Sequence, residues 1–278
     1  YMIRRPEGEV KRRIIMGGHA DSSWEWRYTH MGGKNLMIPS LAIPIVGLFV
    51  IMTVIILALC HVNDKVVTVL GYAMLVLVPF DIGLFFFINH KVVVQGANDN
   101  LTGCMAACSV MKFMGDNGIR FENTEVVAML SGAEESGLRG MKAFVKEHKD
   151  WLLDPNVETM VLEIDTLRDY EDMFIYNRDM SGLCHHDERV CDLVIEAGKT
   201  ADAVLKRASV WCGASDCVAM SQAGVPAATL AAMNPGPPRY YHTREDTWDN
   251  MQLRTIEKGI DICLEVAFAF DEHGLGTK

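Results

Sequence analysis

The sequence predicts an α/β layered fold with a mostly parallel central sheet, interrupted by an inserted hydrophobic helical hairpin. From residue 91 onward, short apolar runs that look like strands alternate with stretches that look helical. This alternation is typical of a parallel sheet covered by helices. Between residues 37 and 88 the chain instead carries two long apolar runs, which the alternation does not explain and which predict the hairpin.

The two apolar runs cover residues 37–60 and 66–88, and a short polar link at residues 61–65 joins them. The first run has no charged residue and the second has only Asp81. Each is long enough to cross a hydrocarbon core of roughly 30 Å as a helix. Both are apolar around their whole circumference, which argues against a buried pair of core helices. Because a carboxylate is costly in lipid, Asp81 should face the partner helix, lie near the interface or be protonated.

The insertion sets the domain organisation. Residues 1–36 and 91–278 form one domain, and residues 37–90 form a transmembrane helical hairpin inserted in it. The chain begins with Tyr1 and runs quickly into a strand-like stretch, so we expect an N-terminal truncation. A hairpin returns the chain to its starting side, which places both parts of the domain on one face of the membrane. More Lys and Arg flank that side than the link, so the positive-inside rule predicts a cytoplasmic domain.

The remaining elements follow from hydrophobic period and residue type. Strands are expected at residues 13–16, 125–130, 159–164, 173–176, 203–210 and 226–231. Helices are expected at residues 101–114, 138–148, 188–199 and 253–271. The 278 residues suffice for one α/β domain with a large core. The formal net charge of -10 argues against a general nucleic-acid binder.

Five short segments follow predicted strands or lie in loops after them, where open α/β sheets bind ligands. The first contains His19 and Asp21, and a His with an Asp two residues on suits a metal ligand and its orienting carboxylate. The second, residues 96–103, is a polar loop that opens a helix and places Asp99 near its N-terminus. Taken alone, the first segment is better explained by a surface histidine and the second by a helix cap.

The other three segments carry carboxylates or a histidine. Glu134 and Glu135 lie between glycines after an apolar strand, where one carboxylate can bind a metal while its neighbour stays free as a general base. Asp165 ends the next apolar strand, and His242 lies in a polar loop. An acidic turn or an exposed loop histidine explains each segment alone. Together, the five segments supply two His, one Glu and two Asp with a spare Glu, a set that suits a binuclear zinc hydrolase.

In this order the segments resemble the M28 family of zinc peptidases, which includes bacterial leucyl-type aminopeptidases and glutamate-carboxypeptidase-like enzymes. The motifs are His-x-Asp, Gly-Ala-Asn-Asp-Asn-x-(Ser/Thr)-Gly, Glu-Glu, Asp and Tyr-His-Thr-x-x-Asp-Thr, and they run from His19 to His242. The resemblance implies the three-layer zinc-peptidase fold, of the phosphorylase/hydrolase-like type. It makes residues 1–36 the start of a catalytic domain and residues 91–278 its remainder.

The resemblance also implies the ligands of two zinc ions. His19 and Asp165 would bind one ion, and Glu135 and His242 would bind the other. Asp99 would bridge both ions.

Further roles concern the residues around the ions. Glu134 would be the general base and Asp21 would orient the first histidine. Tyr241 or a neighbour would help to hold the oxyanion. The segment that resembles the family's Ser-Asp-His near the substrate pocket is Ser215, Asp216 and Cys217, with Cys in place of the usual His.

Two features depart from the family's pattern. The membrane hairpin occupies the place of a short loop between His-x-Asp and the bridging Asp, and the strand and helix usual before His-x-Asp look missing. Both ends of the hairpin must still meet at the metal site, which a hairpin permits.

The predicted activity is hydrolysis of peptide bonds, most simply the removal of N-terminal residues. A single-zinc glutaminyl cyclase shares the fold and is an alternative, although the intact His19 and Asp99 favour two ions. A non-catalytic membrane receptor or assembly factor on a peptidase fold is another alternative. The motifs do not separate aminopeptidase from carboxypeptidase or dipeptidase activity, and they leave side-chain preference and oligomeric state open.

Overall fold

The computed structural model describes residues 1–180, 182–210, 213–234 and 236–276. The chain divides into two compact units. The sheet unit comprises Tyr1–Ser23, Gln95–Gly236 and Asp246–Lys278, and the hairpin unit comprises Trp24–Val94 and Pro237–Glu245.

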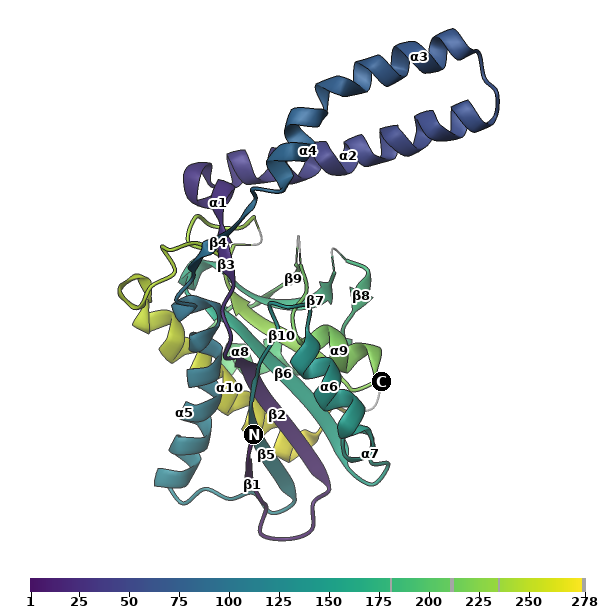
Figure 1. Ribbon diagram of the computed structural model, residues 1–278. Helices are drawn as coiled ribbons and strands as arrows, with labels where there is room; N and C mark the ends of the chain where they lie inside the picture. The colour runs from purple at the N-terminus through teal and green to yellow at the C-terminus, as the bar shows by residue number, and fades with distance from the viewer. Residues whose placement is uncertain (181, 211–212, 235, 277–278) are drawn as a thin grey trace. The chain divides into compact units, whose positions relative to one another are not determined.

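The sheet unit is built on one sheet, which in the described part of the chain has eight strands (Figure 1). The strands are β1 (Met2–Arg4), β2 (Arg12–His19), β5 (Thr124–Ser131), β6 (Glu158–Leu167), β7 (Met173–Asp179), β8 (Cys184–His185), β9 (Lys206–Ser209) and β10 (Ala227–Ala232). They pair in the order β1-β5-β2-β6-β10-β7-β8, and β9 pairs with β7. The central strands β5, β2, β6 and β10 run parallel, while β1, β7 and β8 add antiparallel pairs. This confirms the mostly parallel sheet that the sequence predicts.

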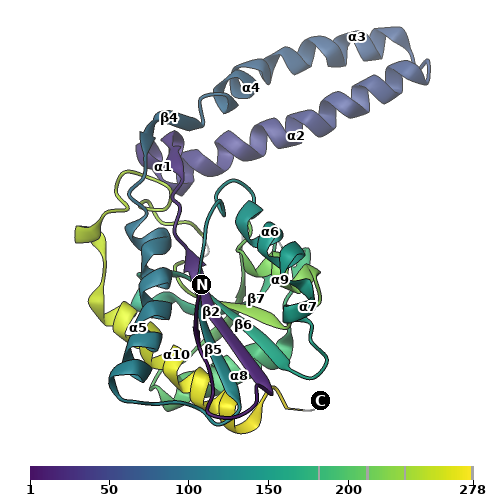
Figure 2. The same ribbon diagram turned by 60° about the horizontal axis from the view of Figure 1, so that its bottom comes forward.

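Helices cover both faces of this sheet (Figures 1 and 2). They are α5 (Thr102–Asp116), α6 (Arg139–Glu147), α7 (Lys149–Leu152), α8 (Glu188–Thr200), α9 (Cys217–Gln222) and α10 (Leu253–His273), with 3₁₀ turns at Tyr170–Asp172 and Trp248–Asn250. Successive residues of a strand face opposite sides of the sheet. On β2, Ile14 and Met16 therefore pack with α5, α8 and α10, and Ile15 packs with α6, α7 and α9. The three layers confirm the predicted fold class.

One predicted strand is shorter than expected. Residues 203–210 were expected as a strand, but only Lys206–Ser209 form one, β9. The preceding residues belong instead to the turn that follows α8, in which Ala203 donates its N–H to the carbonyl of Gly198.

The hairpin unit contains two helical limbs that leave and return through a two-stranded ribbon. In chain order its elements are β3 (Trp24–Trp26), α1 (Arg27–Gly32), α2 (Lys34–Leu59), α3 (Asp64–Ala73), a 3₁₀ turn (Met74–Val76), α4 (Val78–Leu84) and β4 (Ile88–Val93). Strand β3 pairs antiparallel with β4. The α2 limb and the α3–α4 limb lie side by side in both ribbon views.

Within the described residues, α2 is the one unbroken helix long and apolar enough to cross a membrane. The returning limb was predicted as a single helix over residues 66–88, and this prediction is wrong in detail. The limb bends by 47° between its 3₁₀ turn and α4, beside Pro79 in the first turn of α4. Proline has no backbone N–H to donate and its ring clashes with the preceding turn, so a continuous helix breaks there. Counted as one broken span, this limb would be a second crossing.

Close packing of the two limbs places Asp81 against α2. A Cβ atom added to Gly47 would lie 3.2 Å from Cδ1 of Leu77 and 3.9 Å from Oδ1 of Asp81. Asp81 thus faces the partner helix, which is one of the placements expected for it.

Candidate metal centre

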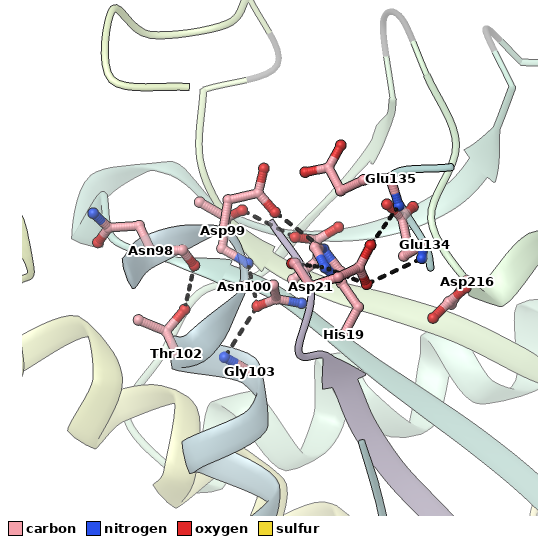
Figure 3. Close-up of polar contacts among 12 residues, drawn as sticks. His19, Asp21, Asn98, Asp99, Asn100, Thr102, Gly103, Glu134, Glu135 and Asp216 are labelled. Atoms are coloured by element: carbon pink, nitrogen blue, oxygen red, sulfur yellow. Dashed lines mark hydrogen bonds and ion pairs between the residues drawn. The ribbon is translucent and has the colours of Figure 1, made fainter. Parts of the chain in front are cut away.

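His19 ends β2 and lies almost fully buried, at 2% exposure. Its Nδ1 lies 3.0 Å from the backbone oxygen of Asp21, and its Nε2 lies 3.1 Å from Oδ1 of Asp99 (Figure 3). A carbonyl oxygen can only accept a hydrogen bond, so Nδ1 carries the proton in this contact. Nε2 is therefore the ring nitrogen available to a metal ion.

Asp99 projects from the loop Ala97–Leu101, which precedes α5. Asp246 holds this loop from the other end of the sequence. Its Oδ1 accepts from the backbone N–H of Asn98 at 2.7 Å and from the Asn98 amide at 2.8 Å, and its Oδ2 accepts from the N–H of Asp99 at 3.1 Å. The sequence analysis quoted Asp246 within a motif but gave it no role. The available signal was that Asp246 is the Asp of the motif Tyr-His-Thr-x-x-Asp-Thr around His242.

The same loop is tied to β6 by Asn100. Its amide donates to the carbonyl of Ile164 at 2.8 Å, and its Oδ1 accepts from the N–H groups of Gly103 at 3.0 Å and Thr166 at 3.2 Å. The peptide bond between Asp99 and Asn100 is cis. The hydrogen bonds of Asn100 hold the neighbouring Asp99 between the end of β6 and the start of α5.

Three of the predicted ligands converge within the sheet unit. Strands β2 and β6 are parallel neighbours, so His19 and Asp165 emerge at the same edge of the sheet. One ligand atom each of His19, Asp99 and Asp165 lies within 4.8 Å of the others. Nitrogen and carboxylate oxygen donors at such spacing suit a divalent cation such as zinc.

Glu134 and Glu135 lie in the loop after β5 and are fixed by Asp21. The carboxylate of Asp21 accepts from the backbone N–H of Glu134 at 3.1 Å and from that of Glu135 at 3.2 Å (Figure 3). Asp21 was expected to orient His19 with its carboxylate. Its backbone carbonyl makes the shorter contact, while the carboxylate oxygen lies 3.7 Å from the ring. An oxygen of Glu135 also lies within 4.8 Å of an oxygen of Asp99.

The electrostatics of this edge call for positive charge. Burial, together with the nearby charges of Asp165, Glu135 and Asp99 and against the opposing effect of His19, raises the pKa of Glu134 to about 9. Burial and the charge of Asp99 likewise raise the pKa of Asp165 to about 7. Burial alone would lower the pKa of His19, but the hydrogen bond and charge of Asp99 raise it well above its usual value. A divalent cation among these groups would offset their repulsion and keep the carboxylates ionised, so the residues fit a metal.

Ser215 and Asp216, predicted near the substrate, make internal contacts. Ser215 is buried, and its hydroxyl and backbone N–H donate to Oδ2 of Asp179 at 2.6 and 3.1 Å. Asp216 accepts a short hydrogen bond from the hydroxyl of Ser131, the last residue of β5. Cys217, in place of the usual His, is fully buried in the core between α9 and α6. The bond between Ser131 and Asp216 braces the end of β5, the strand that leads to Glu134.

A further buried carboxyl group, Glu163, precedes Asp165 in the same segment, and the sequence analysis assigned no role to it. It lies on β6 two positions before Asp165 and is 1% exposed, and its Oε1 has no hydrogen-bond partner among the described residues. Burial raises its pKa well above the usual value, and the nearby charges of Asp216 and Asp165 act in the same direction. The signal was a glutamate inside an otherwise apolar strand.

His242 and Tyr241 belong to the hairpin unit. His242 is 7% exposed, and its ring stacks on that of Tyr241 with centroids 3.9 Å apart. Their roles as zinc ligand and oxyanion partner stay predictions.

Comparison with known proteins places this chain in a family. The model of peptidase family M28 matches residues 57–267, which includes every predicted ligand except His19. A search of curated proteins returned no match.

Several solved structures share the fold. An aminopeptidase from Aneurinibacillus sp. strain AM-1 aligns with a TM-score of 0.59 and 19% identity, covering 96% of this chain and 46% of its own. A zinc aminopeptidase from Bacillus subtilis aligns with a TM-score of 0.58 and 16% identity, covering 96% and 48%. A leucine aminopeptidase precursor from Bacteroides thetaiotaomicron aligns with a TM-score of 0.56 and 16% identity, covering 95% and 73%.

The chain spans about half the length of the first two of these structures. At such identities the likeness establishes the fold, while the family model matches more than half of the chain. The chain belongs to peptidase family M28.

Proposed function

We propose that this chain is a zinc metallopeptidase with two zinc ions that removes N-terminal residues from peptides. The observation that carries the proposal is the convergence of His19, Asp99 and Asp165 within 4.8 Å, beside a buried Glu134. Membership of the M28 family and the fold of known aminopeptidases support it.

The proposed ligands follow the family pattern. His19 and Asp165 would hold one ion, Glu135 and His242 would hold the other, and Asp99 would be a ligand that they share. When bound, the two ions supply Lewis acidity that lowers the pKa of a water molecule and polarises the scissile carbonyl.

Glu134 is the proposed general base. It takes a proton from the attacking water as the oxygen–carbon bond forms, and it passes that proton to the amine nitrogen as the carbon–nitrogen bond breaks. Asp21 positions it, since the Asp21 carboxylate accepts from the Glu134 backbone N–H. Tyr241 is the candidate donor to the oxyanion.

We further propose that the hairpin anchors the enzyme in a membrane, with the catalytic domain on the cytoplasmic side. Helix α2 and the bent α3–α4 limb supply the two apolar segments. The excess of Lys and Arg at the base of the hairpin over its link supports this side.

Metal content and activity, measured on one preparation, test this function. The full chain, purified in detergent, is expected to hold about two zinc ions and to release N-terminal residues from aminoacyl amides until a chelator removes the metal. One tightly bound zinc with a pyroglutamate product would replace the proposal with a cyclase. Absence of zinc would favour a non-catalytic membrane protein.

The general base has its own test. Glu134→Gln removes the proton acceptor without removing a ligand, so turnover should fall by roughly 10²–10⁴-fold or more with zinc content unchanged. Glu147→Gln, at an exposed position of α6, is the matched control and should retain activity. Full activity in Glu134→Gln would sink the assignment.

A further inference from the structure

The loop that carries His242 is held by the ribbon at the base of the hairpin, and both lie in the hairpin unit. The backbone N–H of Trp26, on β3, donates to the carbonyl of His242 at 2.7 Å. The indole of Trp26 also meets the His242 ring edge-on, with centroids 4.5 Å apart and planes at 81°. One strand residue thus contacts both the backbone and the ring of a proposed zinc ligand.

A second contact joins the same loop to both strands of the ribbon. Glu25, 1% exposed, accepts from Nε of Arg244 at 2.6 Å and from its terminal nitrogen at 2.7 Å. The amide of Asn89, which lies opposite Glu25 on β4, donates to the same carboxylate at 2.8 Å. Two parallel charge-assisted bonds of this kind fix geometry as well as adding energy. Glu25 therefore joins β3, β4 and the loop through one buried group.

The backbone of His242 shows why the loop needs holding. Its φ is 53°, in the left-handed region that is uncommon for residues with a side chain. Such conformations cost on the order of 1 kcal/mol and persist where the surroundings fix them. Within the loop, the buried Thr243 hydroxyl contributes by donating toward the carbonyls of Arg239 and Tyr240 at 2.9 and 3.0 Å.

We propose that Glu25 and Trp26 are positioning residues for His242, so that the base of the hairpin sets the affinity of the zinc ion that His242 binds. The inference rests on the proposed function, in which His242 is a ligand. Partners behind a ligand govern metal affinity because they fix the orientation of the donor atom, and their loss typically weakens binding by about 10–100-fold.

Metal titration of the full, metal-depleted chain in detergent tests this inference without relying on activity. In Glu25→Ala, calorimetry with zinc should show one of the two ions binding about 10–100-fold more weakly, with the other unchanged. Trp26→Leu, which removes the ring against His242, should weaken the same ion. Glu25→Gln keeps an acceptor oxygen for Arg244 and should restore most of the affinity.

The matched control is Glu188→Ala, which breaks the ion pair of Glu188 with Arg207 in the sheet unit. It should leave both affinities unchanged, even where it lowers the melting temperature. The inference would be overturned if Glu25→Ala and Trp26→Leu both bound each ion with the affinity of the unaltered chain. His242→Ala separates the two proposals: if it loses one ion, the ligand assignment stands whatever the positioning variants do, and if it keeps both, the ligand assignment itself fails. Should Glu25→Ala not fold, Trp26→Leu and Glu25→Gln decide.

Discussion

Asp246 directly holds the backbone of a proposed bridging ligand, Asp99. It is fully buried and accepts from the backbone N–H groups of Asn98 and Asp99 and from the Asn98 amide. A carboxylate offers acceptors only, so it matches this set of donors completely. Loss of an acceptor would leave a buried donor unpaired, which is costlier than the net gain from the bond.

Asp246→Asn therefore tests how far zinc binding depends on this support. The new NH₂ group would face N–H donors, so the loop of Asp99 should shift and zinc affinity should fall by about 10–100-fold. Competition with a coloured chelator measures the affinity. Asp249→Asn changes an exposed neighbour in the same way and should have no effect. Identical affinities in the two variants would show that Asp246 does not support the metal loop.

At the scale of elements, the start of α5 lies unusually close to β6. A Cβ atom added to Gly103 would lie 2.1 Å from the backbone oxygen of Ile164 and 2.6 Å from Oδ1 of Asn100. Glycine at this position lets the helix approach the strand that carries Asp165, and the loop of Asp99 lies between them. The glycine is thus required by packing.

Gly103→Ala should push α5 away from β6 and lower the free energy of unfolding by about 1–3 kcal/mol. Gly115→Ala, in the same helix, is the control, because the added atom would meet only the end of Arg4 at 4.0 Å. There the better helix propensity of Ala should leave stability equal or raise it by up to about 1 kcal/mol. Denaturant unfolding followed by circular dichroism compares them. A Gly103→Ala variant as stable as its control would contradict the packing argument.

At the scale of the whole molecule, the proposed membrane anchoring predicts on which side of the membrane each segment would lie. The two limbs of the hairpin start and end at the β3–β4 ribbon, so a hairpin that spans the bilayer would leave the parts before and after it on one side. The link between α2 and α3 would then lie on the opposite side, together with the exposed Cys60 at the end of α2.

Labelling of Cys60 tests this arrangement. With the catalytic domain in the cytoplasm, a membrane-impermeant maleimide should modify Cys60 in intact cells, and the label should disappear in Cys60→Ser. Modification only after permeabilisation would place the domain on the other side. Release of the chain from membranes by alkaline carbonate, without detergent, would show that the hairpin does not span the bilayer.

The sequence predicts the helices and strands whose apolar residues form a long run or recur with a clear period. Strands β2, β5, β6 and β10 are apolar runs and were expected near their observed positions, so the parallel core was predictable. Strands β1 and β8 and helix α7 span only a few residues, too few for a period to emerge. The returning limb was predicted as one helix because residues 66–88 form one apolar run, and the position of Pro79 in the first turn of α4 emerged only in three dimensions.

The sequence predicted the site residues that would themselves supply a ligand atom to a metal. It predicted less well the residues that act by positioning a neighbour. His19 ends β2 and Asp165 lies near the end of β6, so their meeting at one sheet edge follows from parallel pairing, and Asp99 lies in the loop that opens α5. Asp246 acts through hydrogen bonds with residues far away in sequence, and no local pattern reveals those. The carbonyl contact of Asp21 depends on backbone geometry, which residue type does not encode.

The pairing of β3 with β4 brings the start and the end of the helical insertion next to each other. Trp26 lies opposite Ile88 in the ribbon, and the N–H of Arg27 donates to the carbonyl of Phe87 at 2.8 Å. An insertion whose ends adjoin can be deleted without separating the strands, because a tight reverse turn such as Asn-Gly can join them. A shorter version of this domain, designed to be soluble without detergent, can therefore be made at this ribbon. In it, a turn replaces residues 27–87, and Glu25 and Trp26 stay in place.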